Sequence, residues 1–266
     1  MTKKPDYIQQ FYDARQEQER LASKAGAVEF AVTTAYIDRY LRPGDRILET
    51  GAGTGRYALH YANRGYAVDA LELVASNLHV LQDGITREMN ITPRLGNALD
   101  LSMYQDNSFD VTLVLGPMYH LFTQEEKLTC LREAMRVTRP EGLLFVAYCQ
   151  FDASMIQTCF LHNMYDFLVE NQLLDPERYL AIDNPAGIFT LYRKTQIDAL
   201  NAQLGLNRLH YVGTDMFTLY FPQQINAMEK ELYRKYLEYT FTICENEDMT
   251  GVSNHVLDVL KNPKKA

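Results

Sequence analysis

Residues 47–57 read Ile-Leu-Glu-Thr-Gly-Ala-Gly-Thr-Gly-Arg-Tyr, and this stretch decides the fold. Its first residues predict a buried strand. Three glycines at alternate positions, Gly51, Gly53 and Gly55, follow the strand and lead into a helix that begins at Arg56. Because glycine has no Cβ, the backbone of such a loop can approach a ligand closely. The stretch therefore predicts a ligand-binding turn between a strand and a helix.

The spacing of the glycines differs from that of a dinucleotide-binding turn. In the pattern G-x-G-x-x-G, the third glycine lets the helix pack on the strand beneath the pyrophosphate. Counted from Gly51, that glycine would stand at position 56, where this chain has Arg56. Glu49, at the end of the strand, would also repel a pyrophosphate. A carboxylate there suits a ligand with positive charge, such as the ammonium and sulfonium of S-adenosylmethionine.

Strands and helices alternate on both sides of this turn. Strands are predicted at residues 46–50, 66–73, 93–96, 109–116 and 143–149, and helices at 56–63 and 75–86. Thr123 and Glu126 form a capping box that predicts the start of another helix. This alternation is typical of a parallel, doubly wound sheet. The predicted fold class is α/β: a Rossmann-like, mostly parallel, seven-stranded sheet.

The two ends of the chain are expected to complete and cover this sheet. The predicted helices are 7–41, 155–174, 195–204 and 223–245, and the predicted strands are 187–193, 209–214 and 255–260. We expect one domain over residues 1–266, with an N-terminal helical cap (1–41), a cofactor-binding core (42–149) and the remaining strands with helical lid insertions (150–266). Aromatic residues of the cap are candidates for an acceptor wall or for core packing: Tyr12, Tyr36, Phe160, Tyr165, Phe167, Tyr220 and Phe221.

Two further polar residues follow predicted strands, whose carboxyl ends bind ligands in open α/β sheets. Glu72 stands 21 positions after Gly51, which is about the spacing of a ribose-binding carboxylate. The alternative is an exposed acid at a helix N-terminus. Asp69 is a competitor, but it lies in mid-strand. Asn97 follows the third strand, and its alternative role is that of a turn residue bonded to its own backbone.

Taken together, Glu49, the glycine loop and Glu72 resemble the class I S-adenosylmethionine-dependent methyltransferases, whose first motif is an acidic residue followed by G-x-G-x-G. The resemblance covers about residues 36–149. It implies that Asn97, where the family often has Asp, meets the adenine amino group. The residues expected to bind the cofactor are Glu49, Gly51, Ala52, Gly53, Gly55, Glu72, Leu73, Asn97, Ala98, Leu99 and Gly116.

The resemblance also places the loop Gly116-Pro117-Met118-Tyr119-His120-Leu121 beside the transferred methyl group. Tyr119 and His120 are therefore the expected catalytic residues, with His120 suited to proton removal near neutral pH. The alternative for His120 is a packed, hydrogen-bonded side chain. This loop and the ending around Ser253-Asn254-His255 also resemble a bacterial subgroup of small class I methyltransferases.

Composition narrows the classes of function. The net charge of −8 argues against a nucleic-acid substrate. Neither a secretory signal nor an apolar run of membrane-spanning length is seen, so a cytoplasmic protein with no membrane partner is expected. The four cysteines are widely spaced and the six histidines show no zinc-binding pattern, so reduced thiols and no bound metal are expected.

The expected function is transfer of a methyl group from S-adenosylmethionine to a small-molecule acceptor, by an enzyme. The methylated atom (oxygen, nitrogen or carbon), the acceptor and the choice between monomer and homodimer stay open. One alternative is a non-catalytic protein that binds S-adenosylmethionine, and a weaker one is a protein or RNA methyltransferase. A nicotinamide dehydrogenase is disfavoured by Arg56.

Overall fold

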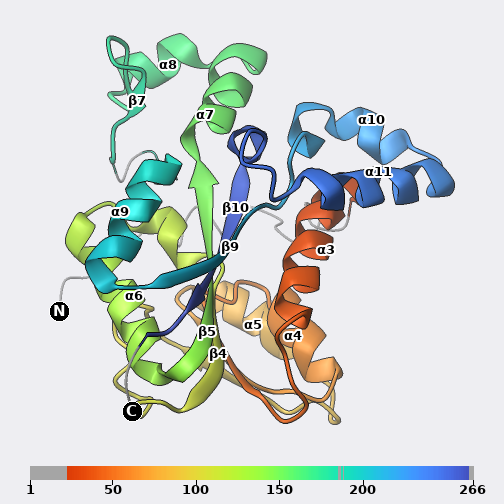
Figure 1. The fold of residues 1–266 in the computed structure, drawn as a ribbon, viewed down its shortest axis with the longest axis vertical. Helices are drawn as coiled ribbons and strands as arrows, with labels where there is room; N and C mark the ends of the chain where they lie inside the picture. Colours follow the sequence, from red (N-terminus) through yellow and green to blue (C-terminus); the bar gives the residue numbers. More distant parts are fainter. Residues whose placement is uncertain (1–22, 185–186, 188, 264–266) are drawn as a thin grey trace.

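A mostly parallel sheet forms the centre of the molecule (Figure 1). The structure is a computed structural model and describes residues 23–184, 187 and 189–263. Within them the strand order is β3-β2-β1-β4-β5-β10-β9, and a short strand, β8, also pairs with β5. The strands are β1 (Arg46–Thr50), β2 (Ala67–Glu72), β3 (Ile91–Leu95), β4 (Phe109–Val114), β5 (Thr138–Gln150), β8 (Leu191–Tyr192), β9 (Asn207–Gly213) and β10 (His255–Lys261). The predicted Rossmann-like α/β fold is confirmed, with β8 as an eighth strand.

The direction of the strands fixes where a ligand can bind. All neighbouring pairs from β3 to β5 are parallel, whereas β10 runs antiparallel to both β5 and β9. The order along the chain reverses between β1 and β4, which lie side by side. At such a reversal the connections leave in opposite directions and open a crevice at the carboxyl ends of the strands. The glycine loop follows β1 at this point.

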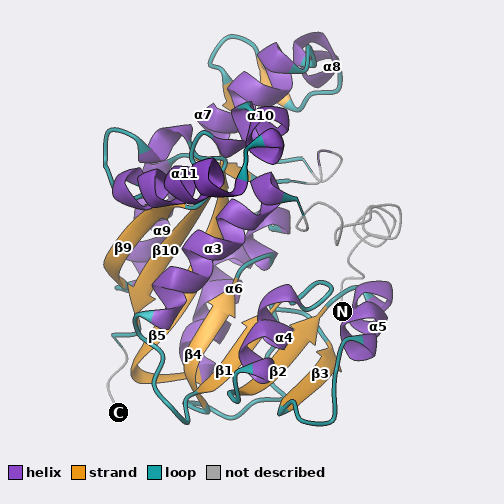
Figure 2. Ribbon diagram, turned by 90° about the vertical axis from the view of Figure 1, so that its right-hand side faces the viewer, coloured by secondary structure: helices purple, strands orange, loops and turns teal. Residues whose placement is uncertain are grey.

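Helices cover both faces of the sheet (Figure 2). On one face, α3 (Lys24–Asp38), α4 (Arg56–Asn63) and α5 (Ala75–Asp83) contribute to one core cluster. On the other face, α6 (Gln124–Val137) and α9 (Lys194–Leu204) contribute to a second cluster. The central strands β1 and β4 are almost wholly buried, as expected for apolar strands covered on both sides.

Several predicted elements match the structure closely. The bounds of β1 and α4 are those predicted, and Gly65 after α4 has a positive φ of 88°. Strand β5 begins at Thr138 instead of 143, because Thr138 still pairs with Phe109 of β4. After an irregular segment that contains Glu141 (φ 63°), regular pairing with β4 and β10 resumes at Leu143. The part of the predicted helix 7–41 before residue 23 lies outside the described residues.

Two predicted long helices are wrong. Residues 155–174 form a π-helical turn, η2 (Met155–Leu161), after α7 (Phe151–Ser154), and then α8 (Tyr165–Glu170). Asn163 between η2 and α8 has a positive φ of 55°, a conformation that asparagine tolerates and that ends a helix. Short strands β6 (Leu174–Asp175) and β7 (Leu180–Ala181) follow.

The predicted helix 223–245 is also divided in two, α10 (Pro222–Ala227) and α11 (Lys230–Ile243). Between them, Met228 is extended, and its carbonyl accepts a hydrogen bond from Lys24 Nζ. The Asn226 side chain likewise accepts from the backbone N–H of Ala25, at 2.9 Å. Contacts with the start of α3 therefore override the helical pattern of the sequence.

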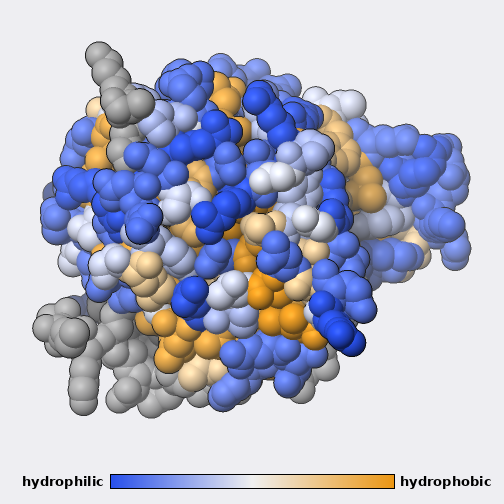
Figure 3. Space-filling view, turned by 90° about the horizontal axis from the view of Figure 1, so that it is seen from below, coloured by the Kyte–Doolittle hydropathy of each residue, from blue (hydrophilic) through white to orange (hydrophobic). Residues whose placement is uncertain are grey.

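Exposed apolar side chains gather in the cap segment, residues 151–182, at the top of Figure 1. Those exposed there are Ile156, Phe160, Leu161, Phe167, Tyr179, Leu180 and Ile182. The opposite end of the molecule is mostly hydrophilic, with smaller apolar patches near the middle and lower part of the view (Figure 3). In the described part of the chain, every helix is too short or too polar to cross a bilayer.

The capping box of α6 provides a test of the local structure. The Thr123 hydroxyl accepts from the backbone N–H of Glu126, and the Glu126 carboxylate accepts from that of Thr123, both at 3.2 Å. Thr123→Ala is expected to lower the free energy of unfolding by about 1 kcal/mol, because a helix N–H loses its partner. Thr129→Ala, on the same helix, should change it by less than about 0.5 kcal/mol. Chemical denaturation of both variants measures this, and equal effects would contradict a role for the cap.

Candidate active site

The glycine loop after β1 is held in a conformation that requires glycine. Gly51, Gly53 and Gly55 have φ angles of 72°, 56° and 89°, a region that side chains with a Cβ rarely adopt. A Cβ on Gly51 would lie 2.8 Å from Pro117 Cδ, and one on Gly55 would lie 2.6 Å from Leu81 Cγ. At Gly51 and Gly55 the loop therefore packs against Pro117 and α5 without room for a side chain, whereas Gly53 is open and needs glycine only for its φ angle.

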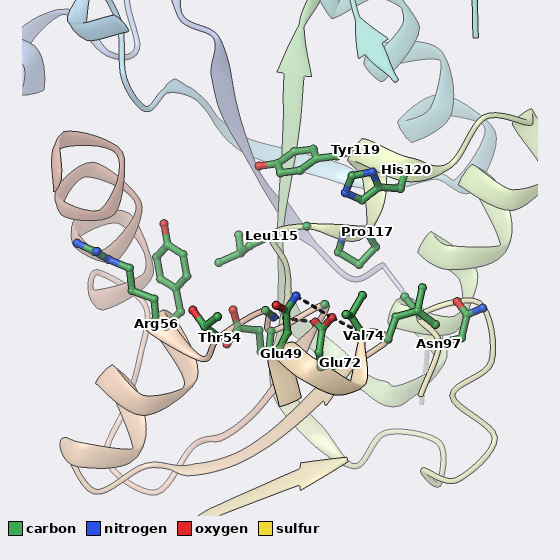
Figure 4. A pocket seen from close by; sticks show the side chains of 18 of the residues that line it. Glu49, Thr54, Arg56, Glu72, Val74, Asn97, Leu115, Pro117, Tyr119 and His120 are labelled. Carbon is green, nitrogen blue, oxygen red and sulfur yellow. Dashed lines mark hydrogen bonds between the residues drawn. The ribbon is translucent and has the colours of Figure 1, made fainter. Parts of the chain in front are cut away.

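A cavity opens at the carboxyl ends of β1, β2 and β4, above this loop (Figure 4). Nine of the eleven predicted cofactor residues line it: Glu49, Gly51, Ala52, Gly53, Glu72, Leu73, Asn97, Ala98 and Gly116. Gly55 and Leu99 are not among the lining residues. Gly55 caps α4 and faces Leu81, whereas Leu99 packs against the core cluster beneath α6 and α9. We call this hollow the first cavity.

Glu49 is a buried carboxylate on the floor of the first cavity, and only 2% of its surface is exposed. It accepts a hydrogen bond from the backbone of Ala58, but its Oε2 has no hydrogen-bond partner within the described residues. Burial raises the pKa of Glu49 to about 8, against the effect of the Ala58 hydrogen bond, and the nearby Glu72 raises it further. A buried acceptor without a partner is costly unless a ligand supplies a donor. The position suits a cationic group.

Glu72 connects the glycine loop to the end of β2. Its Oε2 accepts from the Gly53 N–H at 2.7 Å, and its Oε1 accepts from the Val74 N–H at 2.9 Å (Figure 4). Burial raises its pKa although these hydrogen bonds lower it. The alternative of an exposed acid at a helix N-terminus is therefore wrong. Carboxylate oxygens can accept more than one hydrogen bond, so Glu72 can still accept from a diol.

Asn97 lines the first cavity but uses its side chain in its own turn. Its Oδ1 accepts from the backbone N–H of Leu99, at 3.0 Å. The alternative role of this residue, a turn stabilised by its own side chain, is therefore present. The amide oxygen expected to meet an adenine amino group is already engaged.

Tyr119 and His120 lie in the short 3₁₀ helix η1 (Pro117–His120), which follows β4. Figure 4 shows both rings on the side of the first cavity opposite Glu49 and Glu72. His120 is buried, with its ring 5.3 Å from that of Phe189. Both predicted residues thus face the first cavity, and His120 is also packed as its alternative described.

A second, larger cavity of about 840 Å³ lies between the end of β5, the cap segment and the starts of α3 and α10. Its lining is mainly apolar and includes Phe151, Met155, Leu168, Leu174 and Phe189. Tyr119 lines both cavities, so they meet at its ring. The aromatic residues predicted as an acceptor wall do not line this cavity where the structure describes them. Tyr36 is in the core, Phe160, Phe167 and Phe221 are exposed, and Tyr12 lies outside the described residues.

Three ionisable residues near this boundary were not predicted from the sequence: Glu29, Asp215 and His255. Glu29 lines the first cavity and His255 the second, with Glu29 Oε2 3.8 Å from His255 Nδ1. Asp215 Oδ2 is 2.7 Å from the same Nδ1. Only the motif around Ser253-Asn254-His255 gave a signal, and it named no role.

The same three residues are the one group in the described part of the chain whose side-chain atoms lie close enough, within 4.8 Å, to hold a metal ion. The atoms of Asp215 and His255 that would bind a metal, however, already make hydrogen bonds within the protein. Asp215 Oδ1 accepts from Ser253 Oγ at 2.6 Å and from the Asn254 N–H at 2.8 Å, while Oδ2 faces His255 Nδ1. This arrangement fits an imidazole–carboxylate pair better than a metal site.

Comparison with known proteins agrees with the fold and the glycine loop. Residues 47–142 match a family model described as a methyltransferase domain. Over 106 residues the chain is 40% identical to demethylmenaquinone methyltransferase of Renibacterium salmoninarum, covering 40% of this chain and 41% of that protein. The chain thus spans about two fifths of the length of the curated relatives it matches.

Solved structures resemble the whole described fold. A SAM-dependent methyltransferase from Methanosarcina mazei matches with a TM-score of 0.57 and 14% identity, covering 86% of this chain and 98% of that one. A possible histamine N-methyltransferase from Thermotoga maritima matches with a TM-score of 0.57 and 17% identity, covering 95% and 97%. At these identities the likeness concerns the fold alone. Residues 47–142 therefore match the methyltransferase-domain family, and the chain has the fold seen in S-adenosylmethionine-dependent methyltransferases.

Proposed function

We propose that the protein transfers a methyl group from S-adenosylmethionine to a small, largely apolar molecule. The cofactor would occupy the first cavity and the acceptor the second. The observation that carries this proposal is the buried Oε2 of Glu49, which lacks a partner in the described residues and faces a cavity that meets a second, apolar one. A methyl donor with a cationic amino-acid tail would supply a hydrogen-bond donor to this oxygen through its ammonium group.

The residues of the first cavity fit the separate parts of this cofactor. Glu49 would hold the ammonium group, Glu72 the ribose hydroxyls, and the backbone of the glycine loop the chain between them. Asn97 and Ala98 lie on the wall that remains for the adenine ring. When bound, the cofactor would supply a methyl group carried by a sulfonium. A nucleophile attacks the methyl carbon in line with the carbon–sulfur bond, and the sulfur leaves with the bonding electrons. The protein's part is then to hold the two reactants in register, which is worth roughly 7–11 kcal/mol in well-oriented pairs.

The second cavity favours a small acceptor over a macromolecule. It is lined mainly by apolar side chains, and the net charge of −8 disfavours a nucleic acid. The printed name of several relatives, demethylmenaquinone methyltransferase, also points to a small-molecule acceptor. The four cysteines are free and buried, which supports a reducing, cytoplasmic setting for the reaction.

Titration calorimetry with S-adenosylhomocysteine, the demethylated product, tests the cofactor half of the proposal. We expect one binding site per chain and no binding of NAD. Glu49→Gln should weaken binding by about 1.5–3 kcal/mol, because a hydrogen bond to a charged group is lost. Glu247→Gln, an exposed acid, serves as the control and should bind as the unmodified protein does. Tight binding of NAD, or no binding of S-adenosylhomocysteine, would contradict the proposal.

The acceptor half is tested by measuring S-adenosylhomocysteine formation with a panel of phenols, enols, amines and thiols. Turnover is expected with at least one apolar member of the panel, because the second cavity is large enough to hold one. If the protein binds S-adenosylhomocysteine but turns over no member of the panel, the alternative of a non-catalytic binding protein is favoured.

The raised pKa of Glu49 predicts how cofactor binding depends on pH. In the free protein the carboxyl group is uncharged below about pH 8, whereas an ammonium ligand needs the carboxylate. Binding below that pH therefore releases a proton, and the association constant for S-adenosylhomocysteine should rise about tenfold per pH unit until about pH 8. Calorimetry from pH 6 to 9 measures the slope. Glu49→Gln should bind with little pH dependence, and an unchanged slope in this variant would assign the proton to another group.

A further inference from the structure

His255 occupies the place where the two cavities meet. It is the first residue of β10 and pairs across the sheet with Cys149, near the end of β5. Both residues line the second cavity. The His255 ring lies 5.8 Å from the ring of Tyr119, which lines both cavities, and its Nδ1 lies 3.8 Å from Glu29 of the first cavity. A group held at this boundary can reach an acceptor that lies next to the cofactor.

Asp215 fixes the orientation of the His255 ring. It follows β9, is only 1% exposed, and its Oδ2 lies 2.7 Å from His255 Nδ1. Its Oδ1 accepts hydrogen bonds from Ser253 Oγ and from the backbone N–H groups of Asn254 and His255. A carboxylate held this firmly makes Nδ1 the donor nitrogen. Cys149 also interacts with the ring, and a thiol is a weak hydrogen-bond partner. Because Asp215 engages Nδ1, Nε2 is the nitrogen that we expect to meet an acceptor oxygen.

We propose that His255, oriented by Asp215, binds the oxygen nucleophile of the acceptor, and that the acceptor is an apolar molecule with an ionisable hydroxyl, such as a phenol or an enol. This inference rests on the proposed methyl transfer and names its acceptor class. The apolar second cavity holds the body of such a molecule, and His255 is a polar group on its wall beside Tyr119.

The charges around His255 support proton uptake from a hydroxyl. The groups that face it are Glu29 from α3, Cys149 from β5, Tyr119 from η1, and Asp215. Burial lowers the pKa of His255, but Glu29, Cys149 and the Asp215 hydrogen bond outweigh it and place the pKa well above its usual value. The ring is thus a stronger base than free imidazole, and a bound hydroxyl and imidazole become an oxyanion and an imidazolium.

The atoms balance in a single displacement. Where the ring is neutral, the acceptor O–H bond breaks and its proton goes to His255 Nε2. Where the ring is already an imidazolium, as its raised pKa favours, the acceptor proton goes to water and the oxyanion is held by the ring. An electron pair of the oxyanion then forms the bond to the methyl carbon, while the carbon–sulfur bond breaks and its pair stays on sulfur. The imidazolium returns its proton to water after the product leaves. An acceptor that arrives as the oxyanion meets the imidazolium directly and reaches the same state.

The test uses 4-nitrophenol as the acceptor probe, because only its phenolate absorbs visible light. The protein is first saturated with S-adenosylhomocysteine, and the ionised fraction of bound probe is followed against pH. We expect the bound probe to ionise at least about one pH unit below the free probe, which corresponds to tenfold or more stabilisation of the phenolate. In His255→Gln this shift should disappear while affinity for S-adenosylhomocysteine is kept.

Two further variants show whether the shift depends on His255 in particular and on its orientation. His79→Gln, an exposed histidine on α5, is the control for loss of an imidazole and should keep the full shift. Asp215→Asn tests the positioning role and should reduce the shift without changing S-adenosylhomocysteine affinity. Thermal unfolding of each variant shows whether it is folded. If Asp215→Asn is not folded, His255→Gln still decides the proposal, since His255 lines a cavity.

Three results would overturn the proposal. In the first, the shift is the same in His255→Gln. In the second, the shift is lost in His120→Gln but kept in His255→Gln. In the third, 4-nitrophenol does not bind or binds no better than 4-nitroaniline. All three are measured on protein that binds S-adenosylhomocysteine, so they count against this inference, the first two against His255 and the third against the acceptor class, and not against cofactor binding. Failure to bind S-adenosylhomocysteine at all is a different result and counts against the proposed function.

Discussion

The hydrogen bonds from the backbone N–H groups of Gly53 and Val74 to the carboxylate of Glu72 join two of the loops that form the first cavity. They join the loop after β1 to the loop after β2, at distances of 2.7 and 2.9 Å. With that anchor, the glycine loop keeps the positive φ angles that let Gly51 lie against Pro117, at the end of β4. Three neighbouring strand ends are thus fixed relative to one another, and the cavity is shaped by backbone rather than by mobile side chains.

This arrangement places two buried carboxylates, Glu49 and Glu72, beside each other. Burying a carboxylate is unfavourable, and the raised pKa values of both groups express that cost; at Glu49 the charge of Glu72 adds to it. Glu72 recovers part of it through backbone donors, whereas Glu49 Oε2 finds none in the described part of the chain. A perturbed, incompletely bonded carboxylate in a cavity is characteristic of a binding site. A cation bound there, as proposed for the ammonium group of the cofactor, would lower the cost of burying Glu49.

The sequence predicts most of what depends on neighbouring residues. The β1 strand, the turn into α4 and the Thr123 cap follow from patterns within a few positions. Nine of the eleven residues predicted to bind a cofactor line the first cavity, because parallel strands bring their carboxyl ends to one edge. Contacts between distant segments were not predictable in this way. Met228 ends α10 because it meets Lys24, and His255 joins Asp215 and Glu29 only through the packing of β9, β10 and α3.

The first and second cavities differ in the same way, because one depends on local sequence and the other on contacts between distant segments. The first cavity is made largely by consecutive strand–loop units of the parallel half of the sheet, so a short motif specifies it. The second is made by the cap segment, the start of α3 and the antiparallel pair of β5 and β10, which are far apart in the sequence. Tyr119 is shared by both. Changes in the cap can therefore alter which molecule fits without disturbing Glu49 or Glu72. In the proposed reaction, the group that meets the acceptor atom comes from the sheet itself, where β10 places His255 opposite Cys149 and beside Asp215.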